Sequence, residues 1–166
     1  MIDHLTISVT DYEASKQFYT RVLAPLGFKP LMEFGTMVGF GRAMPVLWIK
    51  QASTGTQPQH IAFQAGSRAM VDAFHQVAVA SGAKDDGAPG LRSTYHPSYY
   101  GAFVIDPLNG HPLEAVIHRA PEAEKKPVSK KVAVKSVAKK LAAKKAPAKK
   151  KAKPAPKKKP ATKAKR

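Results

Sequence analysis

Two histidines and one glutamate have the residue types and the spacing of a metal-binding site. His4 and His60 stand 56 residues apart, each at the start of a segment in which apolar and polar residues alternate. Glu114 lies in the stretch HPLEAVIH, where it interrupts a run that otherwise has the composition of a buried strand. Two imidazoles and a carboxylate can hold a divalent ion and leave coordination positions open for substrate or water. The sequence therefore indicates a facial triad of His4, His60 and Glu114.

The same three residues also have an interpretation without a ligand. The histidines can be solvent-facing side chains at strand ends, and Glu114 can be a carboxylate on an exposed edge strand. If Glu114 is buried, it needs a cation partner or a proton, because an unpaired buried charge is expensive. His111 and His118 lie close to Glu114 in the sequence and are rival ligands, but we expect both at the surface.

A second group of polar and aromatic residues can form the wall of a substrate pocket. In STYHPSYYGA, the hydroxyl groups of Tyr99 and Tyr100 and the imidazole of His96 can hydrogen-bond a small molecule. Arg92, just before this stretch, can present its fork of donors to a carboxylate. Trp48 is a candidate for the apolar floor of the pocket. Ordinary packing, with the hydroxyl groups at the surface and Trp48 in the core, explains the same residues.

Two similar sets of elements must position these side chains. The hydrophobic pattern predicts strands over 2–9, 31–34, 37–41, 46–50, 60–65, 99–105 and 113–118, with a helix after the first and after the fifth of them. The Gly- and Pro-containing segment 83–97 carries no predicted strand. A shift of 56 residues superposes His4 on His60 and Phe18 on Phe74. The order β-α-β-β-β, which the repeat implies for both halves, predicts an α+β fold.

Three stretches together resemble the vicinal oxygen chelate superfamily, which includes glyoxalase I, fosfomycin- and bleomycin-resistance proteins and extradiol dioxygenases. The stretches are IDHLTISVTDYEASKQFYTRVLAPLGF, HIAFQA and GAFVIDPLNGHPLEAVIH. The resemblance covers roughly residues 1–118. It implies a domain at 1–119 whose two βαβββ modules, at about 1–52 and 59–119, form a curved, cleft-like mixed sheet.

The resemblance also implies a ligand set. His4, His60 and Glu114 fall on the metal-ligand positions of the superfamily, where the glutamate also takes part in catalysis. The ion would be Fe, Mn, Ni or Zn. The fourth ligand of glyoxalase I has no equivalent here, because the matching position holds Leu47 or Trp48, and neither binds metal.

One departure from the superfamily pattern concerns the turn before Glu114. The segment from Asp106 to Glu114 is one residue longer than usual, and we place the extra residue at 108–109, within the turn. If the strand absorbed it instead, the side chain of Glu114 would point to the other face of the sheet.

The function that the resemblance implies is that of a divalent-metal-dependent enzyme acting on a small molecule. The reaction would be of the lyase, isomerase, transferase or dioxygenase type. Alternatives are a non-catalytic, resistance-type protein that binds a small ligand, and a nucleoid-associated DNA-binding protein. A homodimer is a further expectation, because modules of this superfamily pair within one chain or between two chains.

The net charge of +17 comes entirely from the C-terminal part of the chain. Residues 1–120 contain nine Lys and Arg against nine Asp and Glu, whereas 121–166 contain 19 against two. The tail, 120–166, is rich in Lys, Ala and Pro like the tails of linker histones, and such a composition predicts disorder. We expect nonspecific binding to DNA, RNA or another polyanion, through the lysines Lys139, Lys140, Lys144, Lys145, Lys149, Lys150, Lys151, Lys157, Lys158 and Lys159. A purely solubilising tail is the alternative.

Composition also excludes several classes of site. The chain has no cysteine, so it has neither a disulfide framework nor a thiolate metal centre. No run approaches the roughly 20 apolar residues of a membrane span, and the first residues do not resemble a signal peptide. We therefore expect a cytoplasmic protein, with nucleoid association through the tail as an extension.

Overall fold

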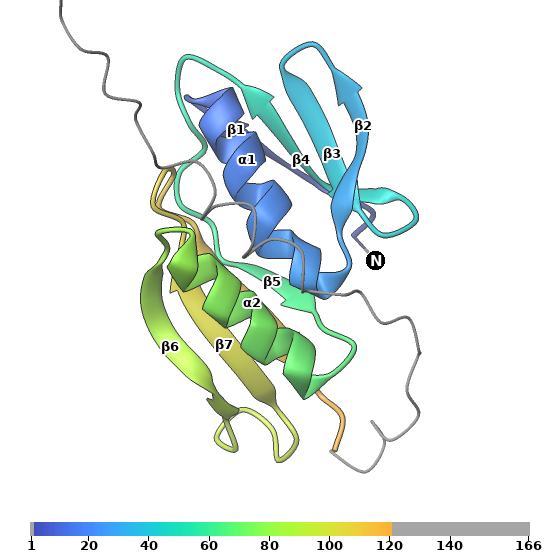
Figure 1. Cartoon of the computed structure of the whole chain (residues 1–166), viewed down its shortest axis with the longest axis vertical. Coiled ribbons are helices and arrows are strands. Elements are labelled where there is room, and N and C mark those ends of the chain that lie inside the picture. Colours follow the sequence, from blue (N-terminus) through green and yellow to red (C-terminus); the bar gives the residue numbers. More distant parts are fainter. Residues whose placement is uncertain (1, 121–166) are drawn as a thin grey trace, which may run out of the picture. The chain divides into compact units, whose positions relative to one another are not determined.

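The structure is a computed structural model that describes residues 2–120, which lie within one compact unit, Met1–Pro127 (Figure 1). Its elements are, in order, β1 (Leu5–Val9), α1 (Tyr12–Leu23), the short 3-10 helix η1 (Ala24–Leu26), β2 (Lys29–Phe34), β3 (Met37–Gly41), β4 (Pro45–Gln51), β5 (Ile61–Gln64), α2 (Arg68–Ala80), β6 (Lys84–Leu91), β7 (Tyr100–Ile105) and β8 (Pro112–Ile117).

Each half of the described chain forms a four-stranded mixed sheet. The strand orders are β1-β4-β3-β2 and β5-β8-β7-β6. In each sheet the first strand runs parallel to the last one, and the other neighbours are antiparallel. The order β-α-β-β-β therefore occurs twice, and the predicted α+β fold of two modules is confirmed.

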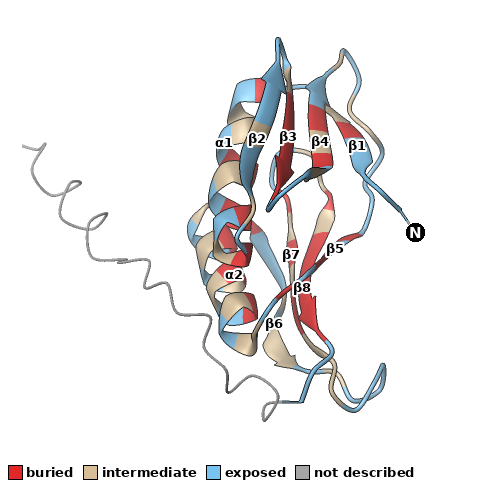
Figure 2. Ribbon diagram, turned by 90° about the vertical axis from the view of Figure 1, so that its right-hand side faces the viewer, coloured by how far each residue is buried: buried red, intermediate tan, exposed pale blue. Residues whose placement is uncertain are grey.

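Each helix begins at a side-chain cap and covers one face of the sheets. The carboxylate of Asp11 accepts the N–H of Ala14 at 3.0 Å, and the hydroxyl of Ser67 accepts the N–H of Met70 at 3.3 Å. Both helices lie on the same side of the strands (Figure 2). Their apolar faces bury residues such as Phe18 in the core. The opposite faces of the sheets are left free of helices.

Contacts between buried polar and aromatic side chains join the modules. The hydroxyl of Tyr19 on α1 donates to Asp106 Oδ2 at 2.9 Å, and both residues are buried. The rings of Phe28 and Phe63 pack edge to face with centroids 5.6 Å apart. Burial, followed by the Asp106 charge, raises the pKa of Tyr19 well above its usual value. The hydroxyl group therefore remains a donor, and the second module is anchored to the first helix.

The turn before β8 is held by hydrogen bonds to the side chain of Asp106. Asp106 Oδ1 accepts the N–H groups of Leu108 at 2.8 Å and Asn109 at 3.3 Å. Gly110 then adopts a φ of 73°, a left-handed conformation that glycine reaches without steric cost. β8 begins only at Pro112. The turn thus ends before β8, in which Glu114 pairs with Ala62 of β5. The extra residue relative to the superfamily stays a prediction.

Strand β6, Lys84–Leu91, lies in the segment 83–97 to which the sequence assigned no strand. It is the edge strand of its sheet and pairs only with β7. The register of this pair shifts between Asp85 and Gly87 and again between Gly87 and Gly90. An edge position tolerates Pro89 and the glycine-rich irregularities. These features are what made the segment look like a connector.

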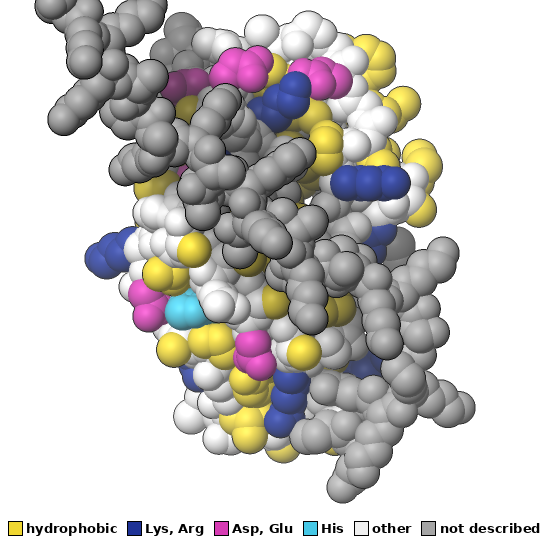
Figure 3. Space-filling model, viewed as in Figure 1, with side chains coloured by type: hydrophobic (Ala, Val, Ile, Leu, Met, Phe, Trp, Pro, Cys, Tyr) yellow, Lys and Arg dark blue, Asp and Glu magenta, His cyan; other side chains and the backbone are white. Residues whose placement is uncertain are grey.

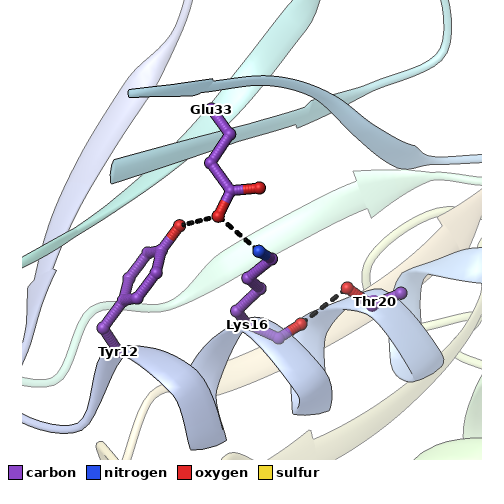
Figure 4. Close-up of polar contacts among 4 residues, drawn as sticks. All are labelled: Tyr12, Lys16, Thr20 and Glu33. Atoms are coloured by element: carbon purple, nitrogen blue, oxygen red, sulfur yellow. Dashed lines mark hydrogen bonds and ion pairs between the residues drawn. The ribbon is translucent and has the colours of Figure 1, made fainter. Parts of the chain in front are cut away.

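A polar cluster ties α1 to the edge strand β2 away from the second module. Glu33 accepts a hydrogen bond from Tyr12 Oη at 2.8 Å and one from the ammonium group of Lys16 (Figure 4). These bonds, from Lys16 first and Tyr12 second, lower the pKa of Glu33. Burial and the Glu33 contact raise the pKa of Tyr12 to about 12. The hydroxyl of Thr20 donates to the Lys16 carbonyl at 2.6 Å and continues the cluster along the helix.

The charges of the described residues are mixed on the helix-bearing side of the molecule. Acidic and basic side chains alternate there with apolar and neutral polar groups (Figure 3). This agrees with the zero net charge of residues 1–120.

Candidate functional site

The side chains of His60 and Glu114 meet on the face of the second sheet that is turned away from α2. His60 directly precedes β5, in which Ala62 is paired with Glu114 of β8. Because side chains alternate along a strand, His60, Ala62 and Glu114 share one face. The imidazole N–H at Nε2 donates to Glu114 Oε2 at 2.9 Å. The His60 side chain is 53% exposed and that of Glu114 only 4%, so an accessible imidazole stands over a buried carboxylate.

Tyr99 contacts the other oxygen of the same carboxylate. Its hydroxyl donates to Glu114 Oε1. Its ring packs edge to face on His118 at 4.9 Å and on Tyr95 at 5.2 Å between centroids. Burial first, and then the bond to Glu114, raise the pKa of Tyr99. Glu114 therefore has a hydrogen-bond donor on each oxygen.

Phe103 and Gly101 on β7 complete the surroundings of this pair, and sequence patterns did not mark them. Phe103 lies opposite Glu114 in the register, and its ring centroid is 6.3 Å from that of His60. A Cβ atom on Gly101 would come within 3.1 Å of Glu114 Oε1. The sequence indicated them only through their positions, because they are alternate residues of a strand that pairs with the strand of Glu114.

Arg92 is close to this site but is already engaged. Its guanidinium group donates to the Ala88 carbonyl at 2.8 Å and stands over the Phe103 ring at 5.5 Å. Binding of a substrate carboxylate by Arg92 stays a prediction.

His4 lies in front of β1 at the edge of a hollow that it shares with His60. The hollow has a volume of about 340 Å³, and its other walls are largely apolar, with Leu5, Val46 and Ile61 among them. The imidazole of His4 is hydrogen-bonded through Nδ1 to Asp3 at 2.7 Å and does not contact Glu114. Within residues 2–120, no three His, Asp or Glu side chains come close enough together to hold one ion. The structure thus joins His60 with Glu114 and leaves His4 apart.

Trp48 occupies the position that corresponds to Glu114 in the first module. Thr6 pairs with Trp48 in the first sheet as Ala62 pairs with Glu114 in the second. The indole lies over Gly39, where a Cβ atom would be 2.9 Å from two of its ring atoms. It stacks on the exposed Phe34 with centroids 6.2 Å apart and an interplanar angle of 20°. Of the two alignments considered for the missing fourth ligand, the register selects Trp48.

Tyr100 and His96 are not gathered around Glu114. The hydroxyl of Tyr100 donates to Asp72 of α2 at 2.7 Å, which places this side chain on the helix-bearing face of the sheet. His96 lies in the loop before β7, where its Nδ1 accepts the N–H of Ser98 at 3.2 Å. Its ring centroid is 6.3 Å from that of His118. Contacts of Tyr100 and His96 with a substrate stay predictions.

The expectation that His111 lies at the surface is wrong. His111 is fully buried, whereas His118 is exposed as expected. Nδ1 of His111 accepts the N–H of Gln59 at 2.9 Å, and its Nε2 is buried without a partner among the described residues. Burial lowers the pKa of His111, with partial compensation by the charge of Asp106. The ring therefore holds the chain just before His60 through a neutral acceptor.

The ten predicted polyanion-binding lysines lie outside the described residues. In the part of the chain that is described, no helix is long and apolar enough to cross a membrane.

A comparison of the sequence with protein-family models identifies the family of this chain. The glyoxalase/bleomycin resistance protein/dioxygenase superfamily model matches residues 1–115. The chain belongs to this superfamily. No curated protein matches the chain.

Solved structures show the same fold. A glyoxalase/bleomycin resistance protein from Albidiferax ferrireducens is 27% identical, with 71% of this chain and 98% of that chain covered and a TM-score of 0.60. A glyoxalase/bleomycin resistance protein/dioxygenase family enzyme from Burkholderia phytofirmans is 18% identical, with coverages of 71% and 98% and a TM-score of 0.55. A genomically encoded fosfomycin resistance protein from Listeria monocytogenes is 19% identical, with coverages of 70% and 91% and a TM-score of 0.54. The last two similarities concern the fold alone.

Proposed function

We propose that this superfamily member is a divalent-metal-dependent enzyme that acts on a small molecule, with His4, His60 and Glu114 as metal ligands. The observation that carries the proposal is the contact of a buried carboxylate with an accessible imidazole at 2.9 Å, beside a hollow also lined by the second imidazole. The reaction is of the lyase, isomerase, transferase or dioxygenase type.

The donor set suits a divalent ion such as Fe, Mn, Ni or Zn. Neutral imidazoles and a carboxylate are ligands for these ions, and a nearly buried carboxylate gains from a cationic partner. A bound ion would supply a Lewis acid for two adjacent oxygens of a substrate. The apolar walls of the hollow would exclude water from such a molecule, and His60 and Glu114 would hold the ion from the second sheet.

The third ligand, His4, has to approach from the first module of the same chain or from a second copy. A mixture of His4→Ala and His60→Ala proteins separates these arrangements. In a dimer with shared sites, a mixed pair keeps one site in which both histidines are intact, so metal binding returns on mixing. If each site lies within one chain, every copy lacks one ligand and mixing restores nothing.

Metal analysis of the purified protein tests the proposal itself. We expect about one ion per chain in the wild type and a large loss in His60→Ala. His75→Ala is the matched control. His75 on α2 is hydrogen-bonded to Asp85 on β6 and lies outside the site. Equal metal content in the wild type and His60→Ala would contradict the proposal.

The stacking of the half-buried Trp48 on the exposed Phe34 favours a second function, binding of a small ligand without turnover. Trp48 stands where a fourth ligand would be, and it stacks on the exposed Phe34. Trp48 is the single tryptophan of the chain, so its fluorescence reports directly on a ligand that binds there. Quenching by a ligand that persists in the presence of a chelator would support this function over a metal-dependent one.

For the tail we propose nonspecific binding to nucleic acid or another polyanion, in a cytoplasmic protein associated with the nucleoid. All of the net charge of +17 lies in residues 121–166, and lysines that neutralise phosphates release counterions. We expect the full chain to bind duplex DNA with an affinity that falls steeply with salt. A chain of residues 1–120 should bind far more weakly. The same affinity and salt slope for both proteins would exclude the tail as the binding element.

A further inference from the structure

We propose that Tyr99 is a positioning residue for Glu114 and not a substrate-binding residue. The effect that we expect on metal binding rests on the proposed metal site.

The two oxygens of Glu114 have different partners. Oε1 accepts the hydroxyl of Tyr99, and Oε2 accepts the N–H of His60 at 2.9 Å. The terminal torsion of a glutamate is broad, so a single hydrogen bond leaves the plane of the carboxylate poorly fixed. The bond from Tyr99 selects one orientation and directs Oε2 toward His60. The hydroxyl of Tyr99 is thereby committed to Glu114 and does not face a substrate.

The tyrosine ring itself is held in place by its neighbours. His118 and Tyr95 pack against it edge to face, at interplanar angles of 85° and 76°. Gly101 makes the contact with Glu114 possible, because a Cβ atom there would lie 3.1 Å from Oε1 and 3.2 Å from Tyr99 Cε1. Three separate features thus converge on one hydrogen bond.

The character of the hydroxyl group fits this role. A tyrosine hydroxyl has a single hydrogen to donate, and in this structure it is directed to Glu114 Oε1. Partners that hydrogen-bond a ligating carboxylate orient it, and their loss typically costs 10–100-fold in metal affinity.

The first test measures the affinity of the full chain for Zn²⁺ and Mn²⁺ by competition with a chromophoric chelator. Tyr99→Phe keeps the ring and removes only the hydroxyl, and we expect about 10–100-fold weaker binding. Tyr12→Phe is the control, since it also removes a tyrosine–carboxylate bond but in the first module, and its affinity should equal that of the wild type. An unchanged affinity of Tyr99→Phe in a wild type that does bind metal would overturn the inference and leave the proposed function intact.

The second test is independent of metal and is done in excess chelator. We expect Tyr99→Phe to lower the Tm of the wild type and to leave the Tm of Glu114→Met unchanged, because the partner of the hydroxyl is then absent. The same Tm loss in both backgrounds would overturn the positioning role. A wild type that binds no metal would refute the proposed function, while this test would still decide the role of Tyr99.

Discussion

The buried His111 makes the stability of the protein dependent on pH in the mildly acidic range. Burial lowers the pKa of this histidine below its usual value of 6.5, and the nearby charge of Asp106 offsets this only in part. Below pH 6.5 the unfolded chain takes up a proton at His111 that the folded chain resists. The free energy of unfolding therefore falls as the pH falls through this range, and His111 contributes no pH dependence well above it.

The usual pKa of histidine in the unfolded chain sets an upper limit to this loss of unfolding free energy. If the folded ring stays neutral, the difference in proton binding lowers the free energy of unfolding by at most about 1.3 kcal/mol between pH 7 and pH 5.5. The hydrogen bond from Gln59 also disappears on protonation, because Nδ1 can no longer accept the Gln59 N–H. At a pH low enough to protonate the folded ring, the segment that carries His60 therefore loses this attachment.

The assay is urea unfolding of the wild type and of His111→Asn at both pH values. Asparagine can place an oxygen near the position of Nδ1, so it keeps an acceptor for Gln59 and does not titrate. All other titrating groups are common to both proteins and cancel in the comparison. We expect the wild type to lose more stability than His111→Asn on acidification. An identical loss in both proteins would show that His111 does not cause the pH dependence.

Three further predictions concern the elements that support the site. Tyr19→Phe removes a buried donor to Asp106 and should lower the free energy of unfolding by about 1–3 kcal/mol; no change in chemical denaturation would show that this link between modules carries no stability. Gly39→Ala places a Cβ atom 2.9 Å from the indole of Trp48, so we expect a shift in the tryptophan emission maximum, and an unaltered spectrum would contradict the stacked geometry. Asp11→Ala removes the N-cap of α1 and should cost about 0.5–2 kcal/mol in urea unfolding; full stability would mean that the cap is dispensable.

The parts of the fold that follow from local periodicity were predictable from the sequence. Alternation and helical spacing gave the repeated order of elements, and the shift from His4 to His60 located the second module. Strand β6 was missed because an edge strand tolerates proline and register shifts, and these are the marks of a connector in a sequence. Its presence follows from the repeat, which requires three strands after each helix.

The neighbours in the candidate site were only partly predictable. The placement of Glu114 beside His60 depends on where β8 begins after the turn at Asp106, and local hydrogen bonds shape that turn. The burial of His111 was not visible, because its acceptor role toward Gln59 joins residues 52 positions apart. Such contacts arise from tertiary packing within the second module, which no local sequence pattern contains.

Binding of a metal ion by His60 and Glu114 can be observed directly. Anomalous diffraction from crystals of the metal-loaded protein, recorded on both sides of the absorption edge of the ion, tests it most directly. We expect a peak at roughly 2.0–2.2 Å from His60 Nε2 and from a carboxylate oxygen of Glu114, with a His4 imidazole as the third ligand. A density map without this peak, in which His60 still donates directly to Glu114 in fully loaded crystals, would contradict it.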